Sequence, residues 1–140
     1  MVLTDTGYWL ALANKKDRFH QRAKAVSAQL NEDPVTTWPV VTETCYMLQR
    51  DVSVDASRKF LAFLFREQIS IFAVGYQHFA RIDVLMGKYA NLPMDLADAS
   101  LVVLAEELGH GRILSTDQRD FNAYRWKNSH PFTNLLFQGG

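Results

Sequence analysis

The sequence predicts an α/β domain in which a mostly parallel central sheet lies between two layers of helices, a three-layer α/β/α sandwich. Short apolar runs alternate along the chain with longer segments of helical periodicity, and this alternation is typical of parallel sheets with right-handed crossovers. The segment from Leu96 to Ala105 is apolar almost all round, as expected of a helix buried against a sheet. With 140 residues, of which 48% are hydrophobic, the chain is long enough to bury such a core.

The predicted elements follow one another in a regular order. Strands are expected where short apolar runs lie between turn-forming residues: 1–5, 34–38, 69–74 and 112–117, with a last edge strand at 124–126. Helices are expected where apolar residues recur at helical spacing: 8–13, 17–31, 39–50, 54–67, 76–90 and 93–109. No internal repeat interrupts this order.

Local signals support several of these elements. Pro39 suits the first turn of a helix. In the helix at 93–109, Asp95 is a good N-cap, Asp98 follows three residues later, and Gly109 is a stop signal. The helix at 54–67 carries apolar side chains from Phe60 to Phe65 around most of its circumference. We expect that surplus to be covered either by a dimer or partner contact or by a neighbouring helix.

Composition narrows the classes of protein to which the chain belongs. Lys and Arg number 15 and Asp and Glu number 15, so the formal net charge is zero and nucleic-acid contact would require a local basic patch. Cys45 is the single cysteine, which excludes an internal disulfide, and the four histidines are scattered without zinc-ligand spacing. An acid inside the first apolar run argues against a signal peptide, and no apolar stretch approaches membrane-spanning length. We therefore expect a soluble, cytoplasmic protein without membrane partners.

Five acidic residues stand where predicted strands end or predicted helices begin. Asp5 and Asp117 each close a strand, Asp95 and Asp98 open the most apolar helix, and Glu43 lies early in another helix beside apolar neighbours. Because the carboxyl ends of parallel strands form the usual ligand edge of an open α/β sheet, these carboxylates are expected to meet in one crevice. A crowd of carboxylates requires a cation, and all-oxygen ligands favour Mg²⁺ or Mn²⁺. The matching chemistry is hydrolysis of a phosphodiester.

Each acid also has an ordinary structural explanation. The acids that precede or open helices suit capping and the helix dipole, which contribute about 0.3–1 kcal/mol each. Glu43 can be a surface acid at the edge of an apolar stripe, and Asp117 and Asp120 can be loop or turn residues. The choice between these explanations depends on whether the acids meet.

The acidic motifs, taken in order, resemble the conserved acidic stations of PIN domains. They are Asp5-Thr-Gly, Thr42-Glu43, Asp95-Leu-Ala-Asp98-Ala-Ser-Leu and Ser115-Thr-Asp117-Gln-Arg-Asp120-Phe. The chain to about residue 136 resembles the VapC-type toxins of bacterial toxin–antitoxin pairs. The resemblance implies a single PIN-like nuclease domain over 1–136. Residues 134–140 partly resemble a protease-site remnant from recombinant expression, so we expect 137–140 to be a tail without a functional role.

The same resemblance implies a function and roles for the acids. It implies a Mg²⁺-dependent endoribonuclease, with Mn²⁺ as the alternative ion, that acts as a homodimer and has a cognate antitoxin covering its active site. Asp5, Glu43, Asp98 and Asp117 correspond to the catalytic acidic quartet, and Asp95 is an accessory acid. Asp5 and Asp98 are expected to hold the metal directly, Asp117 to ligate it through water or to help a second ion, and Glu43 to bind or deprotonate the attacking water.

Nearby polar residues receive weaker expectations. The hydroxyls of Thr6 and Thr116 are candidates to orient a water molecule. Four basic residues near the Asp117 end of the chain are candidates to track a phosphate backbone, unless they are ordinary solvated surface charges: Arg112, Arg119, Arg125 and Lys127.

Two other functions compete with the nuclease. One is a non-catalytic PIN-fold module that binds RNA or a protein, in which the acids are helix caps and surface charges. The other is a phosphatase of a different α/β family, which requires a second Asp two residues after a nucleophilic Asp. Asp5 is followed by Thr6 and Gly7, and this counts against the phosphatase.

Overall fold

Five parallel strands form the central sheet of the computed structural model, which describes residues 1–138. The strands lie in the order β3-β2-β1-β4-β7, and every neighbouring pair is parallel. Their bounds are β1 Val2–Thr4, β2 Pro34–Thr37, β3 Ser70–Phe72, β4 Arg112–Leu114 and β7 Thr133–Asn134. The predicted parallel α/β architecture is thereby confirmed.

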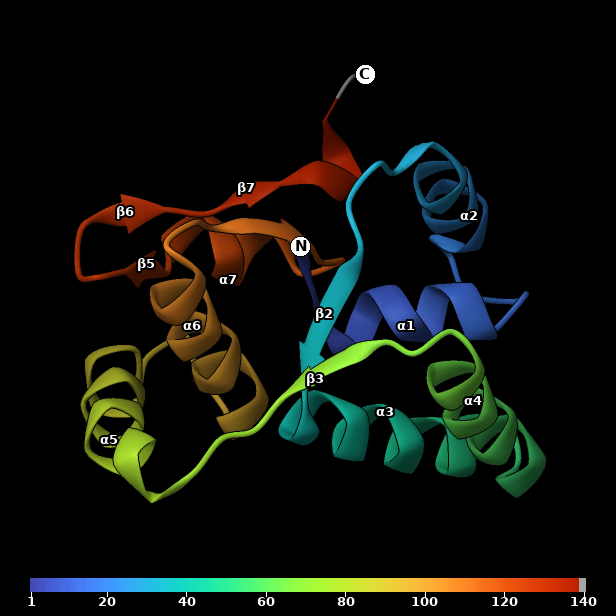
Figure 1. Ribbon diagram of the computed structural model, residues 1–140, viewed down its shortest axis with the longest axis horizontal. Helices are drawn as coiled ribbons and strands as arrows, with labels where there is room; N and C mark the ends of the chain where they lie inside the picture. The colour runs from blue at the N-terminus through green and yellow to red at the C-terminus, as the bar shows by residue number, and fades with distance from the viewer. Residues whose placement is uncertain (139–140) are drawn as a thin grey trace.

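Helices cover both faces of this sheet (Figure 1). In the view of Figure 1, α5 and α6 lie to the left of the sheet, α1, α2 and α4 lie to the right, and α3 runs below. The bounds are α1 Thr6–Ala13, α2 His20–Gln29, α3 Trp38–Asp51, α4 Val54–Arg66, α5 Phe79–Lys88, α6 Leu96–Leu108 and α7 Gln118–Ala123, with short 3₁₀ turns η1 Tyr76–His78 and η2 Leu135–Phe137.

The direction of chain travel across the sheet reverses beside β1. From β1 the chain moves outward to β2 and then β3, and it returns through α5 and α6 to β4, on the other side of β1. Because crossovers between parallel strands are right-handed, the two directions place their helices on opposite faces. The connections after β1 and β4 therefore diverge, and this leaves a crevice at the carboxyl ends of these two strands.

The middle of helix α6 is buried around its whole circumference, as its apolar sequence predicts. From Ala99 to Ala105 no residue is more than 3% exposed. Its start and stop follow the predicted signals: Asp95 and Asp98 cap each other's backbone N–H groups, and Gly109 ends the helix with a left-handed φ of 77°. This burial fixes α6 against β1 and β2, so its N-terminus is held at the sheet's carboxyl edge.

The end of the chain differs from the prediction. The expected edge strand, β5 Arg125–Trp126, does not join the main sheet but pairs antiparallel with β6 His130–Pro131. The turn between them uses left-handed φ values at Lys127 and Asn128, 47° and 66°. Neither residue is glycine, the residue type that adopts such φ values most readily. The edge strand of the main sheet is instead β7, which lies further along the chain.

The surplus apolar surface of α4 is partly buried. Phe60 and Leu64 belong to the core, whereas Phe65 is 80% exposed and Leu61 is also exposed. Phe137, in the predicted tail, packs edge-on against Phe19 with ring centroids 5.4 Å apart. Gly139 and Gly140 of that tail lie outside the described residues. Within residues 1–138, no helix has the length and apolar character needed to cross a bilayer.

Candidate active site

A cleft of about 560 Å³ brings together the acids that the sequence singles out. Two further acids and two arginines also line it. The acids are Asp5, Glu43, Asp95, Asp98 and Asp117, joined by Asp17 and Asp120, and the arginines are Arg18 and Arg119. The cleft lies where β1 and β4 end, so the reversal in the sheet is what makes these distant segments meet.

Asp5 is held at the end of β1 by three hydrogen bonds. Its backbone N–H donates to the Leu114 carbonyl at 3.0 Å. Its side chain accepts from the Thr6 N–H at 2.7 Å and from the Ser115 hydroxyl at 2.8 Å. Burial raises the pKa of Asp5 to about 6, although both side-chain bonds oppose this rise. The carboxylate is therefore fixed in position and poorly solvated.

The turns after β1 and β4 are in direct contact. A Cβ atom built on Gly7 would overlap the Thr116 hydroxyl. Glycine at this position therefore lets α1 begin close to the loop that carries Asp117, and this explains the Thr-Gly that follows Asp5 in the sequence.

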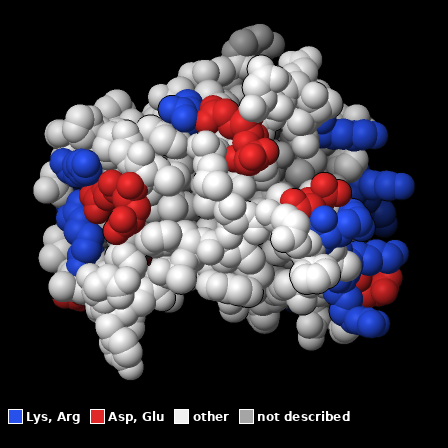
Figure 2. Space-filling view, in the orientation of Figure 1, with Lys and Arg blue, Asp and Glu red and all other residues white. Residues whose placement is uncertain are grey.

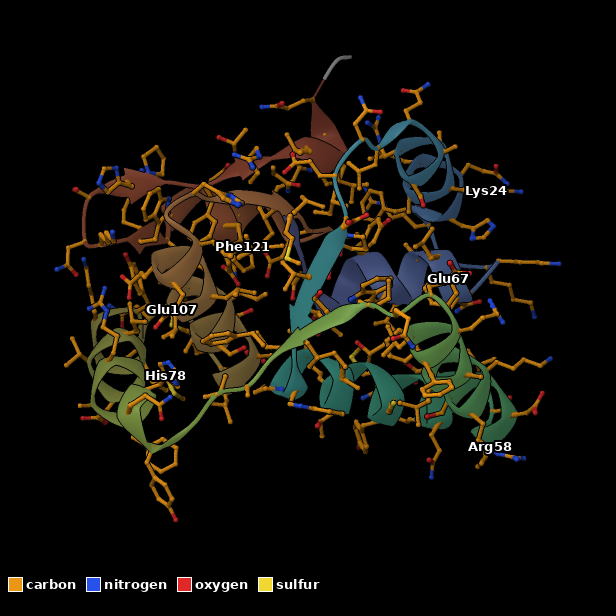
Figure 3. All side chains as sticks on the ribbon, viewed as in Figure 1. Lys24, Arg58, Glu67, His78, Glu107 and Phe121 are labelled. Atoms are coloured by element: carbon orange, nitrogen blue, oxygen red, sulfur yellow. The ribbon has the colours of Figure 1, made fainter. Side chains whose placement is uncertain are left out.

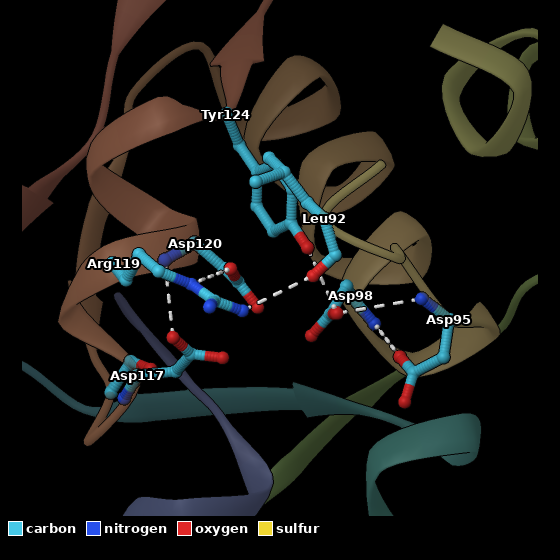
Figure 4. A network of polar contacts seen from close by, with 8 residues as sticks. Leu92, Asp95, Asp98, Asp117, Arg119, Asp120 and Tyr124 are labelled. Carbon is cyan, nitrogen blue, oxygen red and sulfur yellow. Dashed lines mark hydrogen bonds and ion pairs between the residues drawn. The ribbon is translucent and has the colours of Figure 1, made fainter. Parts of the chain in front are cut away.

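Asp95 and Asp98 form the mouth of α6 (Figure 4). Asp95 Oδ1 accepts from the Asp98 N–H at 2.9 Å, and Asp98 Oδ2 accepts from the Asp95 N–H at 3.5 Å. The Tyr124 hydroxyl donates to Asp98 Oδ2 at 3.1 Å. Burial, followed by the charges of Asp5 and Asp95, raises the pKa of Asp98 to about 8. The surroundings of Asp98 thus oppose its ionisation strongly.

Glu43 reaches the same cleft from α3. It is half-buried, and burial, followed by the charge of Asp95, raises its pKa to about 7. Nearby, the Thr6 hydroxyl is buried and close enough to Glu43 to act against the rise of its pKa, but it makes no hydrogen bond of good geometry among residues 1–138. A buried polar atom without a partner is costly, so this hydroxyl is suited to bind a water molecule or a ligand.

Asp117 and Asp120 form the third side of the cleft, at the start of α7 (Figure 4). Asp117 Oδ1 accepts from the Asp120 N–H at 3.1 Å, and burial with the neighbouring Asp120 side chain raises the pKa of Asp117. Arg119 Nε donates to Asp120 Oδ1 at 3.1 Å, and its Nη2 donates to the Leu92 carbonyl at 3.3 Å. Arg119 therefore spans from α7 to the loop before α6.

Of the four basic residues considered from the sequence, Arg119 is the one that lines the cleft. Arg112 pairs with Glu32 at 2.8 Å, at the start of β4 and so at the opposite end of the strand. Arg125 donates to the carbonyls of Asn122 and Tyr124, and Lys127 lies over the Trp126 ring at 5.9 Å.

Four residues of the cleft or its support have no role predicted from the sequence. Ser115 lies inside the motif quoted for Asp117, so its place is visible in the sequence although its bond to Asp5 is not. Tyr124 is 26 residues from Asp98 and gives no sequence signal. The sequence places Asp17 and Arg18 in a helix, but that helix begins only at residue 20 because the Asp17 side chain accepts from the Phe19 N–H and forms a turn.

The side chains of the cleft suit a hard divalent ion by their chemistry, but they do not converge on one point. Among residues 1–138, no three Asp, Glu, His or Cys side chains are grouped so that they could already hold one ion. The donors that line the cleft are nevertheless carboxylates, with an unpartnered hydroxyl beside them. A nearby cation would also lower their raised pKa values. We conclude that the donor set fits Mg²⁺ or Mn²⁺.

Comparison with known proteins identifies the fold. No protein-family model matches the chain, and no curated protein matches its sequence. Among solved structures, the chain is similar to VapC20 of Mycobacterium tuberculosis, described as a toxin that cleaves the sarcin-ricin loop. The TM-score is 0.79 at 19% sequence identity, over 85% of this chain and 92% of that one. The chain therefore shares the fold of VapC20, in agreement with the PIN-domain resemblance of the acidic motifs.

Proposed function

We propose that this chain is a metal-dependent endoribonuclease that hydrolyses RNA phosphodiester bonds, and that it is the toxin of a type II toxin–antitoxin pair. One observation carries the proposal: five acids predicted from four separate motifs line one cleft at the carboxyl edge of the sheet. The similarity in fold to a toxin described as cleaving the sarcin-ricin loop supports the same conclusion.

Asp5, Asp98, Asp95 and Asp117 are the residues that would hold Mg²⁺ or Mn²⁺. When bound, such an ion supplies positive charge for the phosphodiester transition state and makes the attacking water more acidic. Asp5 and Asp98 are the principal candidates, because each is fixed by hydrogen bonds from a neighbouring hydroxyl.

Glu43 is the candidate general base. A base works best when its pKa lies near the working pH, and burial beside Asp95 raises the pKa of Glu43 to about 7. The Thr6 hydroxyl, which lies beside Glu43 without a well-formed hydrogen bond, is the candidate to orient the water whose proton Glu43 accepts. Ser115 and Tyr124 act as positioning residues, since each donates to one oxygen of a metal-holding carboxylate.

The expected partners are an antitoxin protein and a second copy of the chain, in the cytoplasm. An open, mainly apolar groove of about 850 Å³ supports protein contact beside the cleft, with which it shares Glu43 and Asp95. Trp38 and Phe79 line that groove and are more than half exposed. The exposed Phe65 on α4 is a second apolar surface available to a partner.

A non-catalytic RNA- or protein-binding module remains the alternative, and a specific observation favours it. Asp5, Asp95 and Asp117 each cap a helix, and Asp98 completes the cap of α6. Capping alone therefore explains why four of the acids occur where they do. It does not explain Glu43, which caps nothing and whose charged form is opposed by its surroundings.

Cleavage of total cellular RNA by purified, antitoxin-free protein separates the two functions. The reactions contain Mg²⁺ or EDTA, with Asp5→Ala and Asp5→Asn as variants; the asparagine keeps a side-chain oxygen for the cap of α1. Discrete fragments made by the unmodified protein with Mg²⁺, and by neither variant, are the expected result. Folded protein that cuts no RNA and gains no thermal stability from Mg²⁺ would contradict the nuclease and favour the binding module.

A further inference from the structure

Two arginines line the acidic cleft, and the proposed metal-binding and catalytic roles of the acids give them no function. Among the described residues that line it, seven are Asp or Glu and two are arginines, Arg18 and Arg119. A polyanion that enters such a cleft meets repulsion from every carboxylate that no cation neutralises. Positive side chains at the rim are therefore where a phosphate backbone can first be held.

Arg18 is presented by a loop with defined structure, residues 14–19 between α1 and α2. Asn14 Oδ1 accepts from the Lys16 N–H at 3.0 Å, and Asp17 Oδ1 accepts from the Phe19 N–H at 2.8 Å. The Arg18 guanidinium lies over the Phe19 ring at 4.8 Å. No carboxylate among residues 1–138 forms an ion pair with it. The loop thus holds an arginine with free donors at the cleft.

Arg119 keeps donors available although it is bonded. Its Nε and Nη2 atoms bind Asp120 and Leu92, whereas Nη1 makes no hydrogen bond to the residues described. The side chain is 77% exposed, and a guanidinium has five N–H donors in a planar fork. Arg119 can therefore bind a phosphate oxygen while Asp120 holds its orientation.

Further basic side chains stand in the same loop. In Figure 2, Lys and Arg lie at both side edges of the molecule, with Asp and Glu among them, so the loop is not part of a purely basic surface. Lys15 and Lys16 stand in the same loop as Arg18, and both are exposed. In a chain whose net charge is zero, these two lysines place further positive charge next to Arg18 in the loop.

We propose that Arg18 and Arg119 form a phosphate clamp that holds the RNA backbone at two separate points of the cleft rim. The clamp rests on the proposed function for its ligand, RNA. It assigns to Arg18 and Arg119 a positioning role: they bind phosphates that flank the bond to be cut, and they do not bind the metal.

The test is the salt dependence of RNA binding, which reports phosphate neutralisation independently of cleavage. A fluorescently labelled single-stranded RNA is titrated with protein in Ca²⁺ over a series of NaCl concentrations, and the RNA is recovered to confirm that it is intact. For a single strand, log K decreases linearly with log salt. The magnitude of this slope becomes smaller by about 0.7 for each phosphate that the protein no longer neutralises. Arg18→Ala and Arg119→Ala should each show such a fall, and the double variant should show about 1.4.

Matched variants separate a local contact from general charge. Arg58 is exposed, projects from α4 at the lower right of Figure 3, and does not line the cleft. Arg58→Ala removes the same charge and should leave the slope unchanged. Arg18→Lys and Arg119→Lys should retain most of the slope because they keep the charge, and melting temperatures of all variants check the fold.

Each remaining outcome decides for or against the clamp. The clamp would be overturned if Arg18→Ala and Arg119→Ala both left the salt-dependence slope unchanged. It would also be overturned if Arg58→Ala reduced the magnitude of the slope as much as they do. An equal loss of binding to a poly-glutamate peptide would also overturn it, by marking the loop as a site for acidic protein. Cleavage is scored separately: reduced slopes in a protein that cuts no RNA would keep the clamp and remove the nuclease, whereas cleavage with unchanged slopes would do the reverse.

Discussion

The Asp98 carboxylate is the residue at which the catalytic and structural explanations differ most clearly. Burial and the charges of Asp5 and Asp95 oppose its ionisation, so its charge destabilises the metal-free protein. Asp98→Asn should therefore leave the melting temperature unchanged or raise it, because an amide oxygen can still accept from Tyr124 and the Asp95 N–H. RNA cleavage should fall to background. Both are measured on one protein preparation, by thermal melting and by a cleavage assay.

The control is an aspartate outside the cleft. Asp33 precedes β2, at the opposite end of the sheet, so Asp33→Asn should change neither property. A folded Asp98→Asn protein with full activity would contradict the assigned mechanism.

Tyr124 tests whether orientation of Asp98 matters separately from its charge. Tyr124→Phe removes the hydroxyl that donates to Asp98 at 3.1 Å but keeps a ring that packs on Tyr89 and Phe121. Loss of such an orienting group typically costs about 10-fold to 100-fold in metal affinity or activity. Isothermal titration with Mn²⁺ measures the affinity. The control is Tyr76→Phe, at a tyrosine that is 87% exposed, and it should not change the affinity for Mn²⁺. If Tyr124→Phe also left the Mn²⁺ affinity unchanged, the Tyr124 hydroxyl would not be needed to orient Asp98.

The candidate acids are predictable from the sequence, whereas the residues that position them are not. Asp5 and Asp117 follow apolar strands, and Asp95 opens an apolar helix, so local pattern alone indicates their common edge. The bonds from Ser115 to Asp5 and from Tyr124 to Asp98 depend on tertiary approach, which no local spacing records.

At the scale of elements, the contact between the β1–α1 and β4–α7 turns sets the width of the cleft. Gly7→Ala would place a Cβ atom into the Thr116 hydroxyl, so one turn must move. Overpacking of this kind costs about 1–3 kcal/mol. The melting temperature should fall by several degrees, and cleavage should fall with it because Asp5 and Asp117 move apart.

A double-mutant cycle with Thr116→Ala identifies the cause. Removal of the Thr116 hydroxyl should recover part of the stability lost in Gly7→Ala, giving a coupling free energy between the two positions. Strictly additive effects would mean that Gly7 is required for some other reason. Gly87, whose Cβ position is open, provides the control for a glycine-to-alanine change within a helix.

Elements with strong local signals are predicted closely, and elements fixed by long-range packing are not. Helix α6 is indicated by Asp95, Gly109 and the apolar run between them. The β5–β6 hairpin depends on left-handed φ values at Lys127 and Asn128. Asparagine is common in that conformation but lysine is not, so the sequence gives only a weak turn signal. Helix α7 has six residues, and the sequence favours a turn there because so short a segment shows little periodicity.

At the scale of the whole molecule, the alternation of strands and helices predicts a parallel sandwich but does not predict the order of its strands. The order β3-β2-β1-β4-β7 follows from which crossovers pack on which face, a property of the assembled core. That order creates the crevice beside β1 and gathers the carboxylates there, so the proposed function depends on a feature that the sequence pattern leaves open.

The gathered carboxylates give the stability of the whole molecule a distinctive dependence on pH. In the metal-free protein the pKa values of Asp5, Glu43 and Asp98 are raised to about 6, 7 and 8. Between the ordinary carboxyl pKa values near 4 and these raised values, the folded state binds more protons than the unfolded state, so stability falls as pH rises. Below that window Glu32, with a pKa lowered to about 2 by hydrogen bonds from Arg112, acts in the opposite direction.

We therefore expect the melting temperature in EDTA to be higher at pH 5 than at pH 8, with the difference reduced in Asp98→Asn. Mg²⁺ should raise the melting temperature more at pH 8 than at pH 5, because the carboxylates must be ionised to bind it. At 100 times the dissociation constant, binding adds about 2.7 kcal/mol to the free energy of unfolding. NaCl at matched ionic strength is the control. If Mg²⁺ stabilised the protein equally at both pH values, the ion would be bound by groups other than these acids, and helix capping would be the better explanation for the carboxylates of the cleft.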